Sequence, residues 1–348
     1  MSGLKHPRIV CLLLAVSLSL FSRAAMTAAI ADSPAAARIG VVATGDPIAL
    51  QRAGISWYLT FGFDGSPPSN MKRASVVRLL PPPDVKTLRA AVLANKGGAW
   101  LIGNEPNVST AATSDNLSPD EYAVLLNKLE TVIHDADSTA LIVGPDVLNW
   151  SDSCGGCDGG YTLGFDWTQQ FYNAYQSRYG TRPPIDRWAI HTYELDWQHT
   201  PNLHTDFHVR QLTALRQWLD SMPAEAGRSI WDSELGFHWG FHGWKFDDQH
   251  KLVPASSYDD AGAQSWLQSM LDWLMSDGAG LGIERSFLYG QAPAEEGFSE
   301  EYGGLALFYD GSADSDLSET GKVLSAFMTS YADSADSAAS TGSADSSR

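Results

Sequence analysis

The chain has 348 residues, of which 44% are hydrophobic, and its formal net charge is −18. This length can bury one large core, and a single α/β barrel needs about 250 residues, so no second domain is required. An acidic surface repels nucleic-acid phosphates and anionic lipids, which argues against both as partners, whereas a neutral polysaccharide remains compatible. We expect the protein to be a monomer.

The first 31 residues have the layout of a secretory signal peptide. Lys5 and Arg8 precede an apolar run from Ile9 to Phe21, and small residues follow around Ala24 to Ala31. The run is too short to span a membrane comfortably, although an uncleaved N-terminal anchor is the alternative. We therefore expect an extracellular or periplasmic protein without membrane association after cleavage.

Strand-like and helix-like segments alternate between residues 32 and 329. The strand candidates are Ile39–Ala43, Ile55–Phe61, Ser75–Leu80, Trp100–Gly103, Ala140–Gly144, Trp188–His191, Ser229–Ser233 and Ile283–Leu288. Amphipathic helices are expected at Val85–Leu93, Pro119–Ala136, Trp167–Tyr179, Val209–Ser221 and Ala261–Ser276. Eight parallel strands alternating with helices predict an α/β fold, the closed (β/α)8 or TIM barrel. On this count Glu105 ends strand four and Glu234 ends strand seven.

After signal cleavage, Cys154 and Cys157 would be the cysteines that remain. Their Cys-Gly-Gly-Cys spacing in an oxidising compartment favours a local disulfide that pins the loop. A redox or zinc role is the weaker alternative, because neither a strand-to-helix context nor four zinc ligands accompany the pair.

The C-terminal segment, residues 330–348, consists almost entirely of Ser, Ala, Asp and Gly. Such a tail cannot bury enough apolar surface to offset the entropy of ordering it. We expect it to be disordered.

Two segments, Trp100–Asn107 and Ser229–Gly236, carry the clearest functional pattern. In each, an apolar run ends on a glutamate close to a chain-breaking residue, which places Glu105 and Glu234 at the carboxyl ends of strands. Barrel enzymes keep their catalytic groups at this end. Two such glutamates could face each other across one sugar, one donating a proton and the other attacking the anomeric carbon. This pattern indicates a glycoside hydrolase.

The same segments resemble a known group of enzymes. Gly103-Asn104-Glu105-Pro106-Asn107, the His191-Thr192-Tyr193 turn and Trp231-Asp232-Ser233-Glu234-Leu235-Gly236 resemble the signature segments of the clan A glycoside hydrolases, which are retaining (β/α)8 enzymes. The resemblance covers most of residues 38–330, and Ser56-Trp57-Tyr58 looks like the GH128- and GH39-type members.

The resemblance implies a role for each matching residue. Glu105 would be the acid/base and Glu234 the nucleophile, and the Asn104 amide could bind a sugar 2-hydroxyl in the transition state. His191 and Tyr193 would line the site, with the tyrosine hydroxyl holding the nucleophile. For His191 and Tyr193 the alternative is a core position with satisfied polar tips.

Two residues depart from the clan pattern. Asp232 stands where relatives usually carry an aliphatic residue, and a period of two would put it on the same side of the strand as Glu234. A like charge there would raise the pKa of the nucleophile, unless a cation pairs with Asp232. Asp232 also keeps open a carbohydrate-binding barrel without turnover. Tyr289 stands where many relatives have a tryptophan.

Several other residues are candidates for substrate binding. Arg78 lies among aliphatic residues and needs a carboxylate partner, either Glu234 or the acid of an ordinary structural ion pair. Tryptophans in loops on the catalytic side are candidates for stacking on sugars, and we expect two of these four to do so: Trp150, Trp197, Trp239 and Trp244. Trp57 and Tyr289 join them as candidates.

No cofactor or metal is expected. His204 and His208 are four apart, as are His238 and His242, but glycines interrupt the second pair and no acid completes a zincin pattern. A metal-dependent hydrolase, which chelation would inactivate, is a further alternative. The expected partner is a polysaccharide or oligosaccharide that an endo-β-glucanase-like enzyme cleaves, while the sugar and the linkage stay open.

Overall fold

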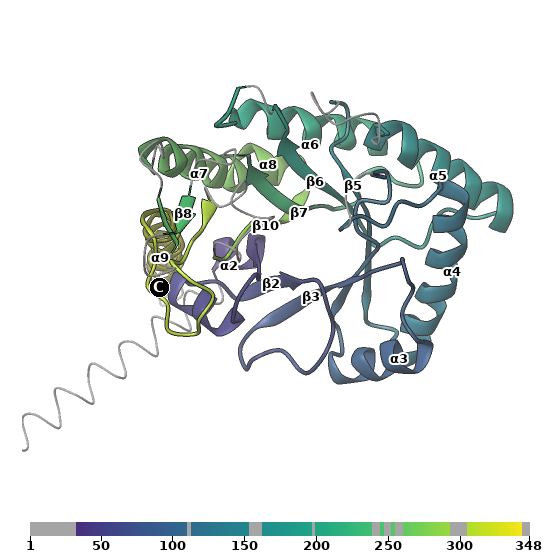
Figure 1. The fold of residues 1–348 in the computed structure, drawn as a ribbon, viewed down its shortest axis with the longest axis horizontal. Helices are drawn as coiled ribbons and strands as arrows, with labels where there is room; N and C mark the ends of the chain where they lie inside the picture. Colours follow the sequence, from purple (N-terminus) through teal and green to yellow (C-terminus); the bar gives the residue numbers. More distant parts are fainter. Residues whose placement is uncertain are drawn as a thin grey trace, which may run out of the picture.

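The computed structural model describes residues 33–109, 113–152, 162–196, 199–238, 244–246, 252–254, 260–292 and 305–342. Eight parallel strands close into a barrel in the order β1-β10-β7-β6-β5-β4-β3-β2 (Figure 1). Their bounds are β1 Ile39–Val42, β2 Trp57–Thr60, β3 Lys72–Val77, β4 Ala99–Ile102, β5 Leu141–Leu148, β6 Arg187–Glu194, β7 Ile230–Phe237 and β10 Ile283–Leu288. The predicted (β/α)8 barrel is confirmed.

Helices surround this barrel on its outer side (Figure 1). Their bounds are α2 Pro34–Arg38, the 3-10 helix η1 Pro47–Ala53, α3 Val85–Ala94, α4 Pro119–Ala136, α5 Gly164–Tyr179, α6 Thr205–Asp220, α7 Asp260–Met275, α8 Asp277–Gly280 and α9 Glu319–Gly342. The start of α4 shows how sequence sets these bounds, because Ser118 and Glu121 form a capping box around Pro119. No helix lies between β2 and β3, where residues 61–71 connect the strands directly. A short antiparallel pair, β8 (Trp244–Phe246) and β9 (Leu252–Pro254), follows β7.

Alternate strand residues point to opposite sides of the sheet, which creates two apolar layers. The inner layer fills the barrel and is small: Val42, Leu59, Ala74, Val76, Ala99, Leu101, Val143, Ala189, Trp231 and Phe287. A much larger layer lies between the strands and the surrounding helices and includes Trp100, Trp188, Tyr122 and Phe171. The polar site described below therefore lies on strands that are held rigidly from outside.

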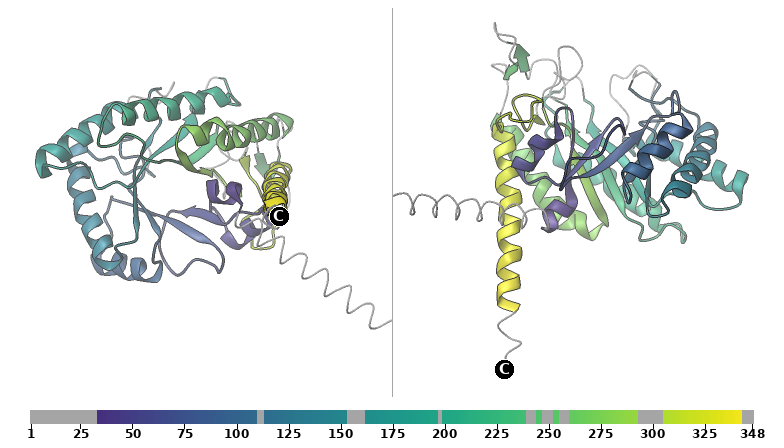
Figure 2. Two further views of the ribbon diagram at one scale, coloured as in Figure 1. Left: turned by 180° about the vertical axis from the view of Figure 1, so that it is seen from behind. Right: turned by 90° about the horizontal axis from the view of Figure 1, so that it is seen from below.

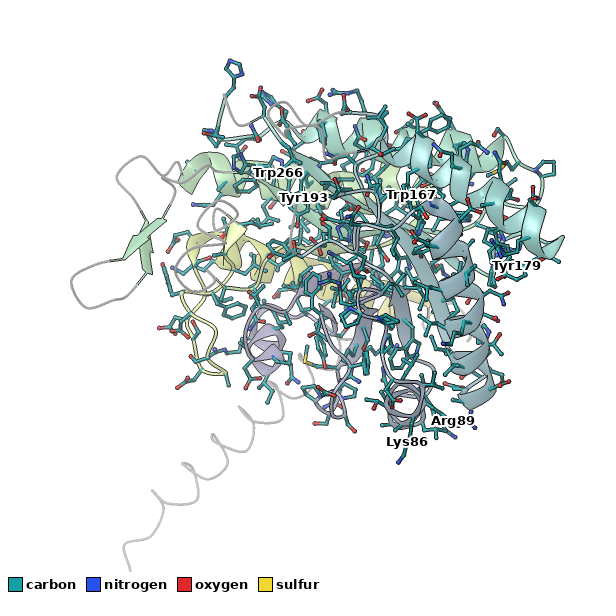
Figure 3. The ribbon with its side chains drawn as sticks, turned by 45° about the vertical axis from the view of Figure 1, so that its right-hand side comes forward. Lys86, Arg89, Trp167, Tyr179, Tyr193 and Trp266 are labelled. Atoms are coloured by element: carbon teal, nitrogen blue, oxygen red, sulfur yellow. The ribbon has the colours of Figure 1, made fainter. Side chains whose placement is uncertain are left out.

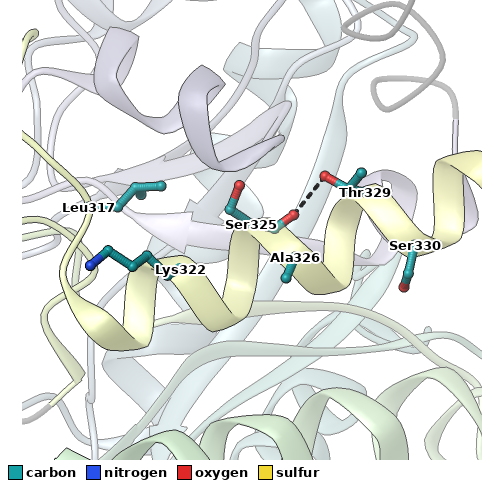
Figure 4. Close-up of a pocket in the computed structure, with 6 residues that line it drawn as sticks. All are labelled: Leu317, Lys322, Ser325, Ala326, Thr329 and Ser330. Atoms are coloured by element: carbon teal, nitrogen blue, oxygen red, sulfur yellow. Dashed lines mark hydrogen bonds between the residues drawn. The ribbon is translucent and has the colours of Figure 1, made fainter.

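The C-terminal end differs from the sequence expectation, because α9 continues as a helix to Gly342. Its first half packs against the barrel through the buried Leu324, Phe327 and Met328. Figure 2 shows the rest of α9 extending past the barrel. A surface groove of about 480 Å³ beside α9 (Figure 4) has these lining residues: Leu317, Lys322, Ser325, Ala326, Thr329 and Ser330.

Three expectations fall on residues that the structure does not describe. These are the signal peptide over residues 1–31, the Cys154–Cys157 disulfide, and the end of the tail over residues 343–348. Within the described ranges, no helix combines the length and the apolar character that a membrane crossing would need.

Candidate active site

The two predicted catalytic glutamates meet at the carboxyl end of the barrel. Glu105 follows β4, and Glu234 lies in the last half of β7. Together with His191 on β6 they form a cluster in which one carboxylate oxygen of each glutamate and one ring nitrogen lie within 4.8 Å of one another. Because β5 and β6 separate β4 from β7, the two glutamates can meet only across the concave inner side of the barrel.

Glu105 is held at both its backbone and its carboxylate. Its amide donates a hydrogen bond to the carbonyl of Asp146 at 3.0 Å. The hydroxyl of Ser114 donates to Oε2 at 2.8 Å, and Nδ1 of His191 lies 3.1 Å from Oε1. Its backbone has a φ of +46°, a conformation that the surrounding contacts must hold in place.

Glu234 is buried and accepts a hydrogen bond from the hydroxyl of Tyr193 at 2.8 Å. This is the contact that the family resemblance implied. Burial raises the pKa of Glu234 to about 7, with the charge of Glu105 acting in the same direction and that of His191 opposing it. A Cβ at Gly236 would lie 2.9 Å from Cε1 of Tyr193, so glycine at this position lets the tyrosine ring reach Glu234.

His191 lies between the two carboxylates. Its Nδ1 is 3.1 Å from Glu105 Oε1 and 3.7 Å from Glu234 Oε2. Burial alone lowers the pKa of the imidazole, but the charges of Glu234 and Glu105 and the hydrogen bond to Glu105 outweigh it and raise the pKa to about 9. At neutral pH His191 is therefore an imidazolium that partly neutralises the pair.

Asn104 is fixed by a neighbouring acid. Asp115 Oδ2 accepts hydrogen bonds from the amides of Leu79 and Asn104, at 3.1 and 2.8 Å. The side-chain amide of Asn104 donates to the carbonyl of Thr113 at 2.9 Å. Its Oδ1 is buried and has no hydrogen-bond partner among the described residues, which leaves it able to accept a bond from a sugar hydroxyl.

The partner of Arg78 is Asp115, not Glu234. Arg78 Nε lies 2.7 Å from Asp115 Oδ1, so this ion pair ties the end of β3 to the segment that follows Asn104. The structure therefore supports the structural alternative for Arg78.

The expectation that Asp232 and Glu234 share one side of β7 is wrong. The pairing of β6 with β7 shifts between Ile190–Asp232 and His191–Glu234, so Ser233 is an extra residue and the period of two is broken. Asp232 accepts a hydrogen bond from the Thr192 hydroxyl at 2.9 Å, on the side that faces helix α6. Burial raises the pKa of Asp232 well above its ordinary value, and its side chain lies behind the barrel wall.

Two of the candidate tryptophans are structural. Trp57 begins β2 and so lies at the amino end of the barrel, opposite the glutamates, with the guanidinium of Arg285 3.7 Å from its ring centroid. Trp150 is 2% exposed and packs in the outer core, 5.3 Å from Trp218 between ring centroids. The position of Trp150 in a predicted loop therefore did not imply that its ring is exposed.

Of the remaining aromatic candidates, Tyr289 lies in the site and the others fall on positions whose side chains the structure does not describe. Tyr289 follows β10 and packs edge-on against Tyr193 at 6.0 Å between ring centroids, which places it beside Glu234. Tyr193 is among the side chains that Figure 3 labels. Trp197 and Trp239 lie outside the described residues, as does the side chain of Trp244.

The histidine pairs considered as metal ligands do not form metal sites in the described part of the chain. His204 contacts Glu194, whereas His208 is buried against the Thr192 hydroxyl and burial lowers its pKa to about 3. His242 lies outside the described residues. The cluster of Glu105, His191 and Glu234 has the donor atoms for a divalent cation, and a metal ion bound there would have to displace the proton of His191.

Sequence analysis missed Asp146, Ser114 and Ser233. Asp146 is 1% exposed and is within hydrogen-bond distance of Ser233, the residue before Glu234. The signal that could have found it is Gly144-Pro145, a pair that interrupts an otherwise apolar strand and indicates a bulge.

Comparison with known proteins gives fold relatives only. No family model matches the sequence, and no curated protein matches it. A GH128 subgroup I endo-β-1,3-glucanase from Amycolatopsis mediterranei, in complex with laminarihexaose, is similar over 83% of this chain and 99% of that one, with 18% identity and a TM-score of 0.55. A GH128 subgroup III curdlan-specific exo-β-1,3-glucanase from Blastomyces gilchristii has 17% identity over 84% and 99%, with a TM-score of 0.55.

A third similar structure is a GH128 subgroup VII oligosaccharide-binding protein from Trichoderma gamsii. Its identity is 15% over 84% of this chain and 94% of that one, with a TM-score of 0.51. These structures have the GH128 barrel that the sequence resemblance implied. At such identities the likeness establishes a shared fold, which both hydrolases and a binding protein use.

Proposed function

We propose that this protein is a secreted retaining glycoside hydrolase that cleaves β-1,3-glucan. The observation that carries the proposal is the juxtaposition of Glu105 and Glu234 around His191, with the Tyr193 hydroxyl bonded to Glu234. A pair of carboxyl groups across a sugar-sized space is what glycosidic cleavage requires.

The spacing of the pair supports retention over inversion. Retaining enzymes hold their carboxyl groups about 5–5.5 Å apart, whereas inverting enzymes separate them by about 6.5–9.5 Å to admit a water molecule. One oxygen of Glu105 and one of Glu234 lie within 4.8 Å of each other, which is closer to the separation in retaining enzymes than to that in inverting enzymes.

Each residue then has a defined task. Glu105 protonates the glycosidic oxygen while Glu234 attacks the anomeric carbon, which breaks the glycosidic bond and forms a glycosyl ester. Glu105, now a carboxylate, takes a proton from water, and the resulting hydroxide displaces Glu234 from the same face. Tyr193 and His191 stabilise the negative charge that Glu234 regains.

The substrate class is taken from the structural relatives. Two of them are described as β-1,3-glucanases, and one of these was captured with laminarihexaose. The net charge of −18 is compatible with a neutral glucan and disfavours polyanionic polysaccharides.

A second candidate is an oligosaccharide-binding protein without turnover, because one relative with this barrel is described in that way. The sequence feature that favoured a binding protein was Asp232, a second acid expected beside the proposed nucleophile Glu234. Asp232 instead binds Thr192, which contacts His208 of α6, so it does not lie beside Glu234 within the site.

The test is to incubate the secreted protein with laminarin, curdlan and a β-1,4-glucan and to measure released reducing ends. We expect release from the β-1,3-glucans, and Glu234→Gln serves as the matched inactive control. Retention of laminarin without release, equal for both proteins, would establish the binding protein instead.

A further inference from the structure

Asp146 is a buried acid near Glu105 and Glu234, and it takes no part in the proposed mechanism. It is the extra residue of a bulge in β5, because the pairing with β6 steps from Pro145–Ala189 to Val147–Ile190. Its φ of +54° is unusual for a residue with a side chain. Such a conformation persists only where the surrounding structure holds it, and it occurs most often at functional sites.

The backbone of Asp146 binds Glu105, the proposed acid/base. Its carbonyl accepts the amide of Glu105 at 3.0 Å, and this bond lies just beyond the last pairing of β4 with β5. The bulge therefore determines where the chain that carries Glu105 leaves the sheet.

The side chain of Asp146 acts on Glu234 through the neighbouring residue Ser233. The hydroxyl of Ser233 donates to Asp146 Oδ1 at 2.5 Å, and Ser233 is the extra residue that turns Glu234 inward. Because β6 lies between β5 and β7, this bond passes across the inner side of β6, where His191 also projects. Two bulges on separate strands are thus joined through one hydrogen bond.

We propose that Asp146 is a positioning residue that sets the spacing of Glu105 and Glu234. Its carbonyl fixes one glutamate, and its carboxyl group, acting through Ser233, fixes the other. This inference rests on the proposed glycosidase function, and it names a further residue on which that activity depends.

The charges that face Asp146 come from every neighbouring element. They are His191 from β6, Glu105 after β4 and Glu234 from β7, while the phenol of Tyr122 approaches from α4. Burial raises the pKa of Asp146 to about 6, so it is an anion above that pH and favours the imidazolium form of His191. Asp146 therefore acts on the pair both by geometry and by charge.

Two variants separate these effects. Asp146→Asn keeps the size and an oxygen that can accept the Ser233 bond, but it removes the charge. Ser233→Ala keeps the charge and removes the bond. Asp137→Asn is the control, because Asp137 is also largely buried but binds Gly97 and Thr139 before β5 begins, far along the chain from the catalytic ends.

The measurements are kcat and KM on a β-1,3-glucan oligosaccharide, and the titration of His191 by NMR of ring-labelled protein, assigned with a His191→Asn sample. Misplacing a reacting group by about 1 Å can cost about 100-fold in rate. We expect kcat to fall about 10- to 100-fold in Ser233→Ala, which loses the positioning bond, with KM nearly unchanged. We also expect Asp146→Asn to lower the pKa of His191 from about 9, and Asp137→Asn to change neither quantity.

Wild-type kcat in Ser233→Ala would overturn the positioning role, even if Asp146→Asn failed to fold. An unchanged His191 titration in folded Asp146→Asn would overturn the electrostatic part. If the wild-type protein hydrolysed no glucan, the proposed function would fail, but the NMR titration would still measure the coupling between Asp146 and His191.

Discussion

Replacing Glu234 with glutamine should stabilise the fold while abolishing turnover. Burial raises the pKa of Glu234 to about 7 from an ordinary value of 4.5, so the folded state holds its proton more tightly than the unfolded state does. Stability is therefore lost as pH rises from about 4.5 to about 7 and stays reduced above that range. At 1.36 kcal/mol for each pKa unit, the ionised side chain costs the fold about 3 kcal/mol at pH 8.

Part of this gain is offset in the variant, because His191 loses one of the charges that support its imidazolium. We therefore expect Glu234→Gln to be about 1–3 kcal/mol more stable than the wild type at pH 8. At pH 4.5 the gain should be well under 1 kcal/mol, since Glu234 is then protonated in the folded state. For a protein of this size, the gain at pH 8 corresponds to an increase in Tm of about 1–5 °C.

The assay is thermal unfolding of both proteins at pH 4.5 and pH 8, at one scan rate and one ionic strength. Glu319→Gln is the matched control, because it removes an exposed carboxylate at the start of α9 and should give no comparable gain. A change in Tm that is equal at the two pH values, or a loss of stability at pH 8, would refute the reasoning about the buried charge.

Three further predictions concern the chemistry and the disulfide. Glu234→Ala should abolish turnover of every substrate, whereas Glu105→Ala should spare substrates with activated leaving groups, which need no proton; equal losses on aryl glycosides and on glucan would contradict these roles. The first product should have the β configuration by proton NMR before mutarotation, and an initial excess of the α-anomer would indicate inversion. The secreted protein should show no free thiol after denaturation without reductant, and two titratable thiols would disprove the bond between Cys154 and Cys157.

The sequence was sufficient for the barrel and for bringing Glu105 and Glu234 to one end of it. All eight expected strands have counterparts, because buried parallel strands are near-continuous apolar runs that helices and loops separate. The third was placed late, at Ser75–Leu80 against Lys72–Val77 in the structure, since Lys72 and Arg73 concealed its first half. The Asn104-Glu105-Pro106 motif after a predicted strand then placed Glu105 at the carboxyl end of the barrel, where the structure has it beside Glu234.

The differences from expectation, and the choice left open for Arg78, arise because local patterns assume regular strand geometry and carry no information about long-range contacts. Asp232 was placed beside Glu234 by a period of two that the extra residue Ser233 breaks. Trp150 was assigned to solvent because it follows a strand, but long-range packing against Trp218 buries it. The acid that pairs with Arg78 lies 37 residues away, and no local pattern could select it over Glu234.

The distribution of charge in the site favours turnover over binding alone. Asp232 faces away from the pair, and among the described residues the inner side of the barrel places the carboxyl groups of Glu105, Glu234 and Asp146 around the imidazole of His191. Burying the carboxylates of Glu234 and Asp146 destabilises the resting protein, as their raised pKa values show. An oxocarbenium-like transition state develops positive charge on the sugar beside Glu234. A preorganised carboxylate there stabilises this transition state more than it stabilises the bound neutral glucan. A protein that only bound neutral sugars would gain nothing from this arrangement, which is the physical reason to expect hydrolysis.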